Sequence, residues 1–176
     1  EIFSVADSVI IGEVESFFLY SFKNIKDLKK RIIVEKKVDL NDLLQPNFDK
    51  FPIKKYSYFP MLKKKPFLPL QASRGCPYSC SYYCAYAVTQ GSEYRVRLAE
   101  KIFNDVLFLI KRYKVKSIQF RDPTFGINKK QVRAFCDLII KNKIKINWGI
   151  ETRLDLLNKE ELSLMFKAGL RNINVG

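Results

Sequence analysis

The sequence predicts an α/β fold built on a parallel sheet. From about residue 68 onward, four short apolar runs typical of strands alternate with three segments whose apolar residues recur at helical spacing. Such an alternation forms right-handed βαβ units, in which successive strands lie parallel in one sheet. Polar clusters also follow directly after strands, which is where folds of this kind gather their functional side chains.

The first third of the chain carries weaker signals. Ser8–Ile11 is typical of a buried strand. This strand is expected to end at residues 12–15, which precede the apolar stretch 17–22. Residues 24–45 are expected to hold a short helix and an extended piece. Five prolines between Pro46 and Pro69 indicate an irregular connector.

The remaining elements follow in regular order. Asn128 and Asn158 are predicted helix N-caps, Glu161 completes a capping box, and Gly169 is predicted to end the last helix. The expected elements are a strand at 68–73, a helix at 99–113, a strand at 117–120, a helix at 128–140, a strand at 144–150, a helix at 158–169 and a strand at 171–175.

Three cysteines, Cys76, Cys80 and Cys84, lie within nine residues. On a regular helix the outer two would be roughly 12 Å apart along the axis, so the thiols can converge only if this segment is a loop. Gly75 and Pro77 favour a loop. A looped thiolate triad suits zinc, copper(I) or an iron–sulfur cluster, and three ligands leave one metal position open.

Two other residues receive structural interpretations. The fourth cysteine, Cys136, lies on an apolar helical stripe and is expected to pack as a small hydrophobe. Trp148 lies within a predicted strand and is expected in the core. The chain has no histidine, which excludes a histidine-based acid/base mechanism within this segment.

Composition limits the classes of partner. The chain is 47% hydrophobic and has a net charge of +14, with thirteen Lys/Arg against five Asp/Glu between residues 21 and 66. We interpret this excess as solvated lysine-rich surface, and nucleic-acid binding is not expected, although Tyr56, Tyr58 and Phe59 interleave with the lysines. No apolar run is long enough for a membrane span. Crowded cysteines without a secretion signal predict a reducing, cytoplasmic setting.

Several motifs together resemble the radical S-adenosylmethionine (SAM) superfamily, and within it the subgroup that carries an amino-terminal cobalamin-binding domain. They are Arg74–Cys80 with the nearby third cysteine, Tyr94–Arg97, Phe120–Phe125, Trp148–Arg153 and Lys167–Gly169. The resemblance covers about 68–176. It implies the first four strands of a partial (β/α) barrel at 68–176, a connector at 21–67, and at 1–20 the tail of an α/β cobalamin-binding domain, where 12–15 read Gly-Glu-Val-Glu.

The resemblance implies an enzyme that carries a [4Fe–4S] cluster on Cys76, Cys80 and Cys84. The fourth iron would bind SAM, and one electron would cleave SAM to methionine and a 5′-deoxyadenosyl radical. Cobalamin, held upstream, would allow methyl transfer to an unidentified substrate. The family's usual cysteine spacing is three residues and then two, whereas here three residues, 81–83, separate the second and third cysteines. We expect a local bulge to absorb the additional residue.

The resemblance also assigns residues to SAM. Tyr83, or alternatively Tyr82, would lie by the adenine, and Asp122 falls where the family contacts the SAM amino group. The family's Gly-Gly-Glu is absent, so 121–123 would act through backbone carbonyls or the carboxylate. Glu151 and Arg153 would hold the ribose and the carboxylate of SAM, respectively. An ordinary ion pair at the edge of the sheet is the alternative for each.

Expected partners are a small-molecule or lipid substrate and an electron donor such as flavodoxin or ferredoxin. Both ends of the chain look cut, and the 176 residues alone are expected to be unstable or inactive. Two alternatives remain open: a non-enzymatic zinc or iron–sulfur module, and an RNA-modifying radical SAM relative that would use the basic segment.

Overall fold

The computed structural model describes residues 5–23, 31–34, 36–78, 80 and 83–176. The chain divides into two compact units, Glu1–Leu44 and Gln45–Gly176, which are described separately below. The division falls within the segment 21–67 that the sequence predicts as a connector.

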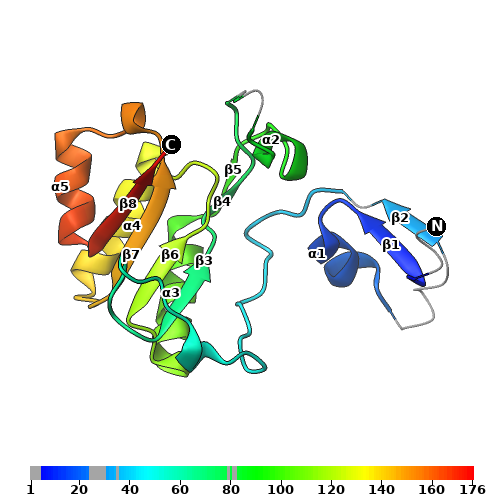
Figure 1. Cartoon of the computed structure of the whole chain (residues 1–176), viewed down its shortest axis with the longest axis horizontal. Coiled ribbons are helices and arrows are strands. Elements are labelled where there is room, and N and C mark those ends of the chain that lie inside the picture. The colour runs from blue at the N-terminus through cyan, green and yellow to red at the C-terminus, as the bar shows by residue number, and fades with distance from the viewer. Residues whose placement is uncertain (1–4, 24–30, 35, 79, 81–82) are drawn as a thin grey trace. The chain divides into compact units, whose positions relative to one another are not determined.

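The first unit contains a parallel pair of short strands (Figure 1). Strand β1, Ser8–Ile11, pairs with β2, Arg31–Val34, and between them α1, Val14–Ser16, continues into the π-helical turn η2, Phe17–Ser21. The predicted strand at 8–11 is confirmed, although it is half-buried to exposed and not buried. Strand β2 provides the expected extended piece. The short helix expected within 24–45 is not found at 31–34 or 36–45, and residues 24–30 and 35 lie outside the described residues.

The second unit is built on a four-stranded parallel sheet, so the predicted fold class is confirmed. Its strands follow one another in sequence order, each connected to the next by a helix (Figure 1). The strands are β3 (Phe67–Leu70), β6 (Ser117–Phe120), β7 (Asn147–Thr152) and β8 (Leu170–Val175), and the helices are α3 (Ala99–Tyr113), α4 (Lys129–Lys141) and α5 (Lys159–Lys167).

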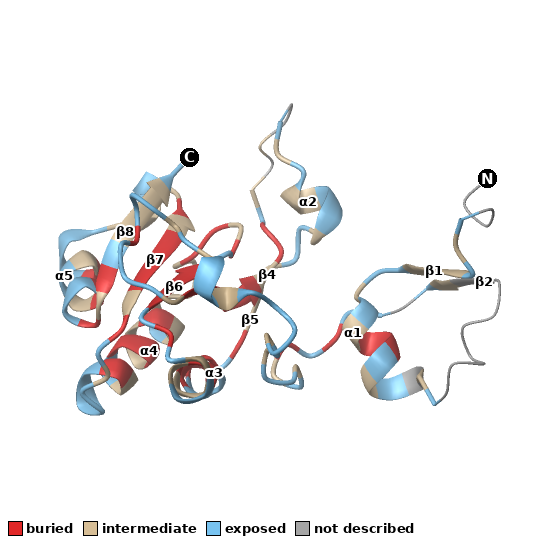
Figure 2. Ribbon diagram, turned by 60° about the horizontal axis from the view of Figure 1, so that its bottom comes forward, coloured by how far each residue is buried: buried red, intermediate tan, exposed pale blue. Residues whose placement is uncertain are grey.

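The core lies between the sheet and these helices, where Figure 2 shows the buried residues. Trp148 is central to it: its ring contacts the rings of Phe120, Phe125 and Phe135, and its Nε1 donates to the Ala168 carbonyl at 2.9 Å. The expectation that Trp148 belongs to the core is therefore confirmed. Cys136 on α4 is fully buried, and burial raises the pKa of its thiol to about 12, as expected for a packing residue.

The predicted helix ends are confirmed by their hydrogen bonds. Asn128 Oδ1 accepts from the Gln131 amide at 3.0 Å, and Asn158 Oδ1 accepts from the Glu161 amide at 2.9 Å. Gly169 follows α5 with φ +106°, and a Cβ there would lie 2.1 Å from the Ile146 carbonyl oxygen. Only glycine satisfies both conditions at this position.

The single strand predicted at 68–73 is wrong in one respect. The chain leaves the main sheet after Leu70, and β4, Ser73–Arg74, pairs antiparallel with β5, Arg95–Val96. Ser73, the end of the predicted strand, thus belongs to a separate two-stranded ribbon, β4 and β5, that carries the cysteine loop. The short helix α2, Tyr86–Thr89, also lies within this excursion.

The connector is irregular, as expected. Between residues 46 and 66 its ordered features are the 3₁₀ turn η4, Ile53–Lys55, and an isolated antiparallel bridge between Tyr58 and Leu62, and β2 lies nearer its start. A second 3₁₀ turn, η5, Leu154–Leu156, follows β7. Among the described residues, no helix combines the length and the apolar character needed to cross a bilayer.

Candidate functional site

The carboxyl ends of β3, β6 and β7 form one edge of the sheet, and three loops that carry candidate residues meet there. The Phe125 amide, after β6, donates to the Glu151 carbonyl at 2.8 Å, and Thr152 Oγ1 donates back to the Phe125 carbonyl at 2.6 Å. The loop after β6 is therefore fixed to the carboxyl end of β7. We call this edge the rim.

Asp122 connects the β6 end of the rim to the start of the ribbon. Its side chain is 1% exposed, and its carboxylate accepts from the Ala72 amide at 2.8 Å and from Ser73 Oγ at 2.7 Å. Burial raises its pKa to about 7 in spite of these hydrogen bonds, which act in the opposite direction. The structure thus shows Asp122 holding the chain where it turns from β3 into β4.

Cys76 occupies a fixed position on the rim. It is buried, its amide donates to the Gly91 carbonyl at 3.0 Å, and its Sγ lies 3.5 Å from Thr124 Oγ1. Gly75, just before it, has φ +81°, and a Cβ at Gly75 would lie 1.9 Å from the Glu93 carbonyl oxygen. The loop can therefore pass this close to the returning chain only with glycine at residue 75.

Cys80 and Cys84 lie further along the loop and are half-exposed free thiols. Across the described parts of the chain, no three His, Cys, Asp or Glu side chains form a group that could hold a metal ion, so the structure does not bring the three thiols around one point. Tyr83 is 83% exposed. Tyr82 and most of the expected bulge lie outside the described residues.

The donor set nevertheless fits an iron–sulfur centre by its chemistry. All three cysteines of the loop are free, the loop begins at a fixed buried thiol, and cysteine thiolates are the usual ligands of such clusters. The fit concerns the kind and number of the donors.

Arg153, after β7, contacts the cysteine loop. Its guanidinium carbon lies 4.4 Å from the centre of the Tyr78 ring, and its Nε and Nη2 donate to the Asp155 carboxylate, each at 3.0 Å. The hydrogen bond to Asp155 raises the pKa of Arg153, and the neighbouring Tyr78 and Cys80 contribute in the same direction. The structure thus brings together Arg153 and the loop, two regions that the sequence predicts to share one edge.

Glu151 is engaged in a different contact. Its carboxylate forms an ion pair with Arg121, which joins the ends of β7 and β6. The alternative to SAM binding by Glu151 was an ordinary ion pair at the edge of the sheet. In the described structure Glu151 forms such a pair.

Sequence reasoning did not find Thr124, Tyr78 or the ion pair that anchors the ribbon. Arg97, after β5, pairs with Asp105 of α3 at 2.7 Å, and both side chains are about 5% exposed. An arginine just before a helix and an acidic residue within its apolar stripe were the available signals. Tyr78 offered only its place inside the cysteine loop.

Side chains alternate between the two faces of the sheet along each strand, and the face opposite the helices carries several polar side chains. Gln119 is fully buried, and its Oε1 would lie 2.2 Å from a Cβ on Gly149. On β8, Asn172 Nδ2 donates to Asn174 Oδ1 at 3.1 Å, and Asn174 Nδ2 donates to the Tyr58 hydroxyl at 2.8 Å. The last of these hydrogen bonds joins β8 to the connector.

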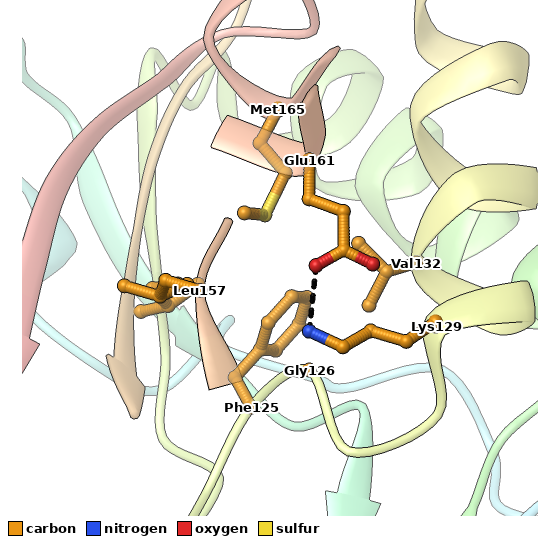
Figure 3. Close-up of a pocket in the computed structure, with 8 residues that line it drawn as sticks. Phe125, Gly126, Lys129, Val132, Leu157, Glu161 and Met165 are labelled. Carbon is orange, nitrogen blue, oxygen red and sulfur yellow. Dashed lines mark hydrogen bonds and ion pairs between the residues drawn. The ribbon is translucent and has the colours of Figure 1, made fainter. Parts of the chain in front are cut away.

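A small pocket lies under the loop between β6 and α4 (Figure 3). Glu161, 5% exposed, forms an ion pair there with Lys129 at 2.6 Å, and Lys129 Nζ also donates to the Leu156 carbonyl. The remaining lining is mostly apolar, with Phe125, Val132 and Met165 among its members. The pair neutralises a buried carboxylate between two helices, and we assign it a structural role.

No protein-family model matches the chain. Curated relatives are an anaerobic magnesium-protoporphyrin IX monomethyl ester cyclase of Rubrivivax gelatinosus, 31% identical over 137 residues, and an uncharacterized methyltransferase of Pyrococcus horikoshii, 30% identical over 134 residues. A hopanoid C-3 methylase of Methylococcus capsulatus is 31% identical over 113 residues. The matches cover 77%, 74% and 63% of this chain, but only 24%, 29% and 21% of the relatives. The chain thus spans about a quarter of the length of these proteins.

Solved structures show the same fold. The radical SAM methyltransferase TsrM of Kitasatospora setae, with cobalamin and a [4Fe–4S] cluster bound, superposes with a TM-score of 0.57 at 18% identity, covering 61% of this chain and 20% of that one. The cobalamin-dependent SAM radical enzyme OxsB gives a TM-score of 0.54 at 20% identity, covering 82% of this chain and 22% of that one.

Proposed function

We propose that this chain is part of a radical SAM enzyme of the cobalamin-dependent kind and supplies its cluster-binding and SAM-binding part, as the motifs of the cysteine loop and the similarity to these relatives and solved structures support. The observation that carries the proposal is the free-thiol loop, which begins at a fixed, buried Cys76 on the rim of a parallel sheet.

In this proposal Cys76, Cys80 and Cys84 hold a [4Fe–4S] cluster. When bound, the cluster supplies the electron for reductive cleavage of SAM at its open iron. Cys76 sets the position of the site, because its backbone is hydrogen-bonded to Gly91 on the returning chain and its thiol lies against Thr124. Arg153 holds the loop against the end of β7 through the ring of Tyr78.

We further propose that the rim holds SAM. Tyr83, largely exposed, is available to cover the adenine, and Tyr82 is the alternative. Asp122 would act mainly by fixing the backbone of 72–73, since its carboxylate already accepts two hydrogen bonds there. Glu151 and Arg153 would contact SAM only if they exchange part of their present pairing with Arg121 and Asp155.

The proposed substrate is a small molecule or a lipid, and methyl transfer with cobalamin held upstream is the proposed outcome. Support comes from the relatives, whose names specify a protoporphyrin ester and a hopanoid, and from TsrM, which was also solved with tryptophan. A flavodoxin or ferredoxin would donate the electron. The four free thiols favour a reducing compartment, and we propose the cytoplasm.

Iron content tests the ligand set. The whole native protein, reconstituted anaerobically, should contain about four irons and four sulfides per chain. Cys76→Ala, Cys80→Ala and Cys84→Ala should each lose most of the iron. Cys136→Ala is the matched control, because it removes a buried thiol of α4 outside the loop, and it should retain the wild-type content.

Two results would contradict the proposal. Stoichiometric zinc in place of iron would favour a structural metal module. Full iron content in Cys84→Ala would show that the widened spacing excludes the third cysteine from the cluster.

A further inference from the structure

The connector presents a tight apolar turn to solvent. The Leu62 amide donates to the Tyr58 carbonyl at 2.7 Å, which leaves Phe59, Pro60 and Met61 at the tip. All three are exposed, with Phe59 at 70% and Met61 at 41%. Large apolar side chains gathered at one exposed turn commonly mark a site of interaction.

The base of this turn is fixed to the body of the unit. Leu62 is buried, the Tyr58 ring stacks on Phe67 at 5.4 Å with an angle of 8°, and the Tyr58 hydroxyl accepts from Asn174. The contacts of Leu62 and Tyr58 therefore fix the base of the turn and leave its apolar tip exposed.

The segment around the turn is basic. Residues 50–65 contain six lysines and no aspartate or glutamate. All six side chains are exposed, and in the part of the chain that the structure describes none of them forms an ion pair. The lysines are Lys50, Lys54, Lys55, Lys63, Lys64 and Lys65.

We propose that this turn docks on an anionic lipid bilayer, with Phe59 and Met61 entering the headgroup region and the flanking lysines contacting lipid phosphates. Polybasic segments bind anionic membranes through charge, and adjacent apolar side chains add insertion. We call residues 58–65 the docking turn. The inference is independent of the proposed function, because it uses no residue of the rim.

A lipid surface fits these residues better than RNA does. Binding to single-stranded RNA relies on aromatic rings that are free to stack on bases. The rings of Tyr56 and Tyr58 are not free in this way, because Tyr56 packs against the core and Tyr58 stacks on Phe67, which leaves Phe59 as the exposed ring of the docking turn. The exposed tip residues are Phe and Met, and residues 45–66 contain no arginine, the residue best suited to bidentate phosphate and base contacts.

Co-sedimentation of the whole native protein with vesicles tests the proposal. Vesicles of phosphatidylcholine and phosphatidylglycerol in equal parts should bind the protein, and phosphatidylcholine alone should not. The triple variant Lys63→Gln, Lys64→Gln, Lys65→Gln should bind roughly a hundred-fold more weakly. The double variant Phe59→Ser, Met61→Ser should weaken binding at least about ten-fold.

Two matched controls test whether binding depends on the docking turn itself or only on the protein's total charge and exposed apolar side chains. Lys101→Gln, Lys130→Gln and Lys159→Gln remove the same charge from exposed positions in the first turns of α3, α4 and α5, and Phe166→Ser removes another exposed phenylalanine. Both controls should bind vesicles like the wild type.

Absence of vesicle binding by the wild type would overturn the proposal, as would equal losses in the test and control variants. Salt-sensitive binding of a transfer RNA that depends on the same lysines, without vesicle binding, would overturn it in favour of a nucleic-acid surface.

Discussion

Asp122 combines two demands at one residue. Its carboxylate aligns the backbone where the cysteine ribbon leaves the sheet, and the burial that this requires raises its pKa to about 7. The sequence indicated the residue by its position after a strand. It could not indicate the partners, because Ala72 and Ser73 are 50 and 49 residues away and only the sheet brings them together.

The raised pKa predicts a pH dependence of stability. Between pH about 4 and about 7 the folded protein holds a proton on Asp122 that the unfolded chain releases, so stability falls as the pH rises through this range. The loss in the free energy of unfolding that comes from ionising the buried Asp122 is complete above about pH 7 and amounts to at most about 4 kcal/mol. Asp122→Asn keeps an acceptor for Ala72 and a donor for Ser73, and should lose this dependence.

Urea unfolding of the whole protein at pH 5 and pH 8 measures the effect. The exposed residue Asp137 on α4 provides the control, since Asp137→Asn should keep the wild-type pH dependence. Equal pH dependence in Asp122→Asn and in the wild type would show that the carboxylate ionises in the fold without penalty.

A second prediction concerns the stability of a variant at Gly75. Gly75→Ala should destabilise the protein by more than about 2 kcal/mol, because it combines the positive φ with a Cβ 1.9 Å from a backbone oxygen. Gly126→Ala is the matched control: its φ is +93°, but nothing lies within 4 Å of the added Cβ, so its cost should be near 1 kcal/mol. Equal melting temperatures for the two variants would contradict the structural explanation.

At the scale of elements, the cysteine ribbon depends on its attachment to α3. Arg97 and Asp105 form a buried pair, and removal of one partner leaves the other charge buried and uncompensated. Asp105→Asn should therefore cost about 3 kcal/mol or more. The exposed pair between Arg133 and Glu160 is the comparison, and Glu160→Gln should change stability by less than about 0.5 kcal/mol.

Thermal unfolding and iron content together test this prediction. Asp105→Asn should lower both the melting temperature and the iron retained by the cysteine loop, since the ribbon carries Cys76. Unchanged iron content at a lowered melting temperature would show that α3 stabilises the fold without positioning the loop.

The elements differ in how far the sequence could predict them. Helices α3, α4 and α5 were predictable because their apolar stripes are local signals, to which α4 and α5 add asparagine caps. The break between β3 and β4 was not, because Ser73 and Arg74 pair with residues more than twenty positions away. The contact of Arg153 with Tyr78 was missed for the same reason: a sequence shows that both lie at one edge and not which side chains meet.

At the scale of the whole molecule, the parallel sheet explains why dispersed motifs act together. The strands run in sequence order, so the cysteine loop, the residues after β6 and the residues after β7 reach the same rim. The helices cover one face, and on the other face Gln119 is fully buried and Asn174 is hydrogen-bonded to Tyr58 of the connector.

The central claim is that three thiols of this loop leave one iron open to SAM. The most direct test is electron paramagnetic resonance of the reduced whole protein, recorded anaerobically before and after SAM is added. We expect a [4Fe–4S] signal that changes on SAM addition in the wild type and in Cys136→Ala, and that is absent in Cys84→Ala. A cluster signal that is indifferent to SAM would contradict the claim.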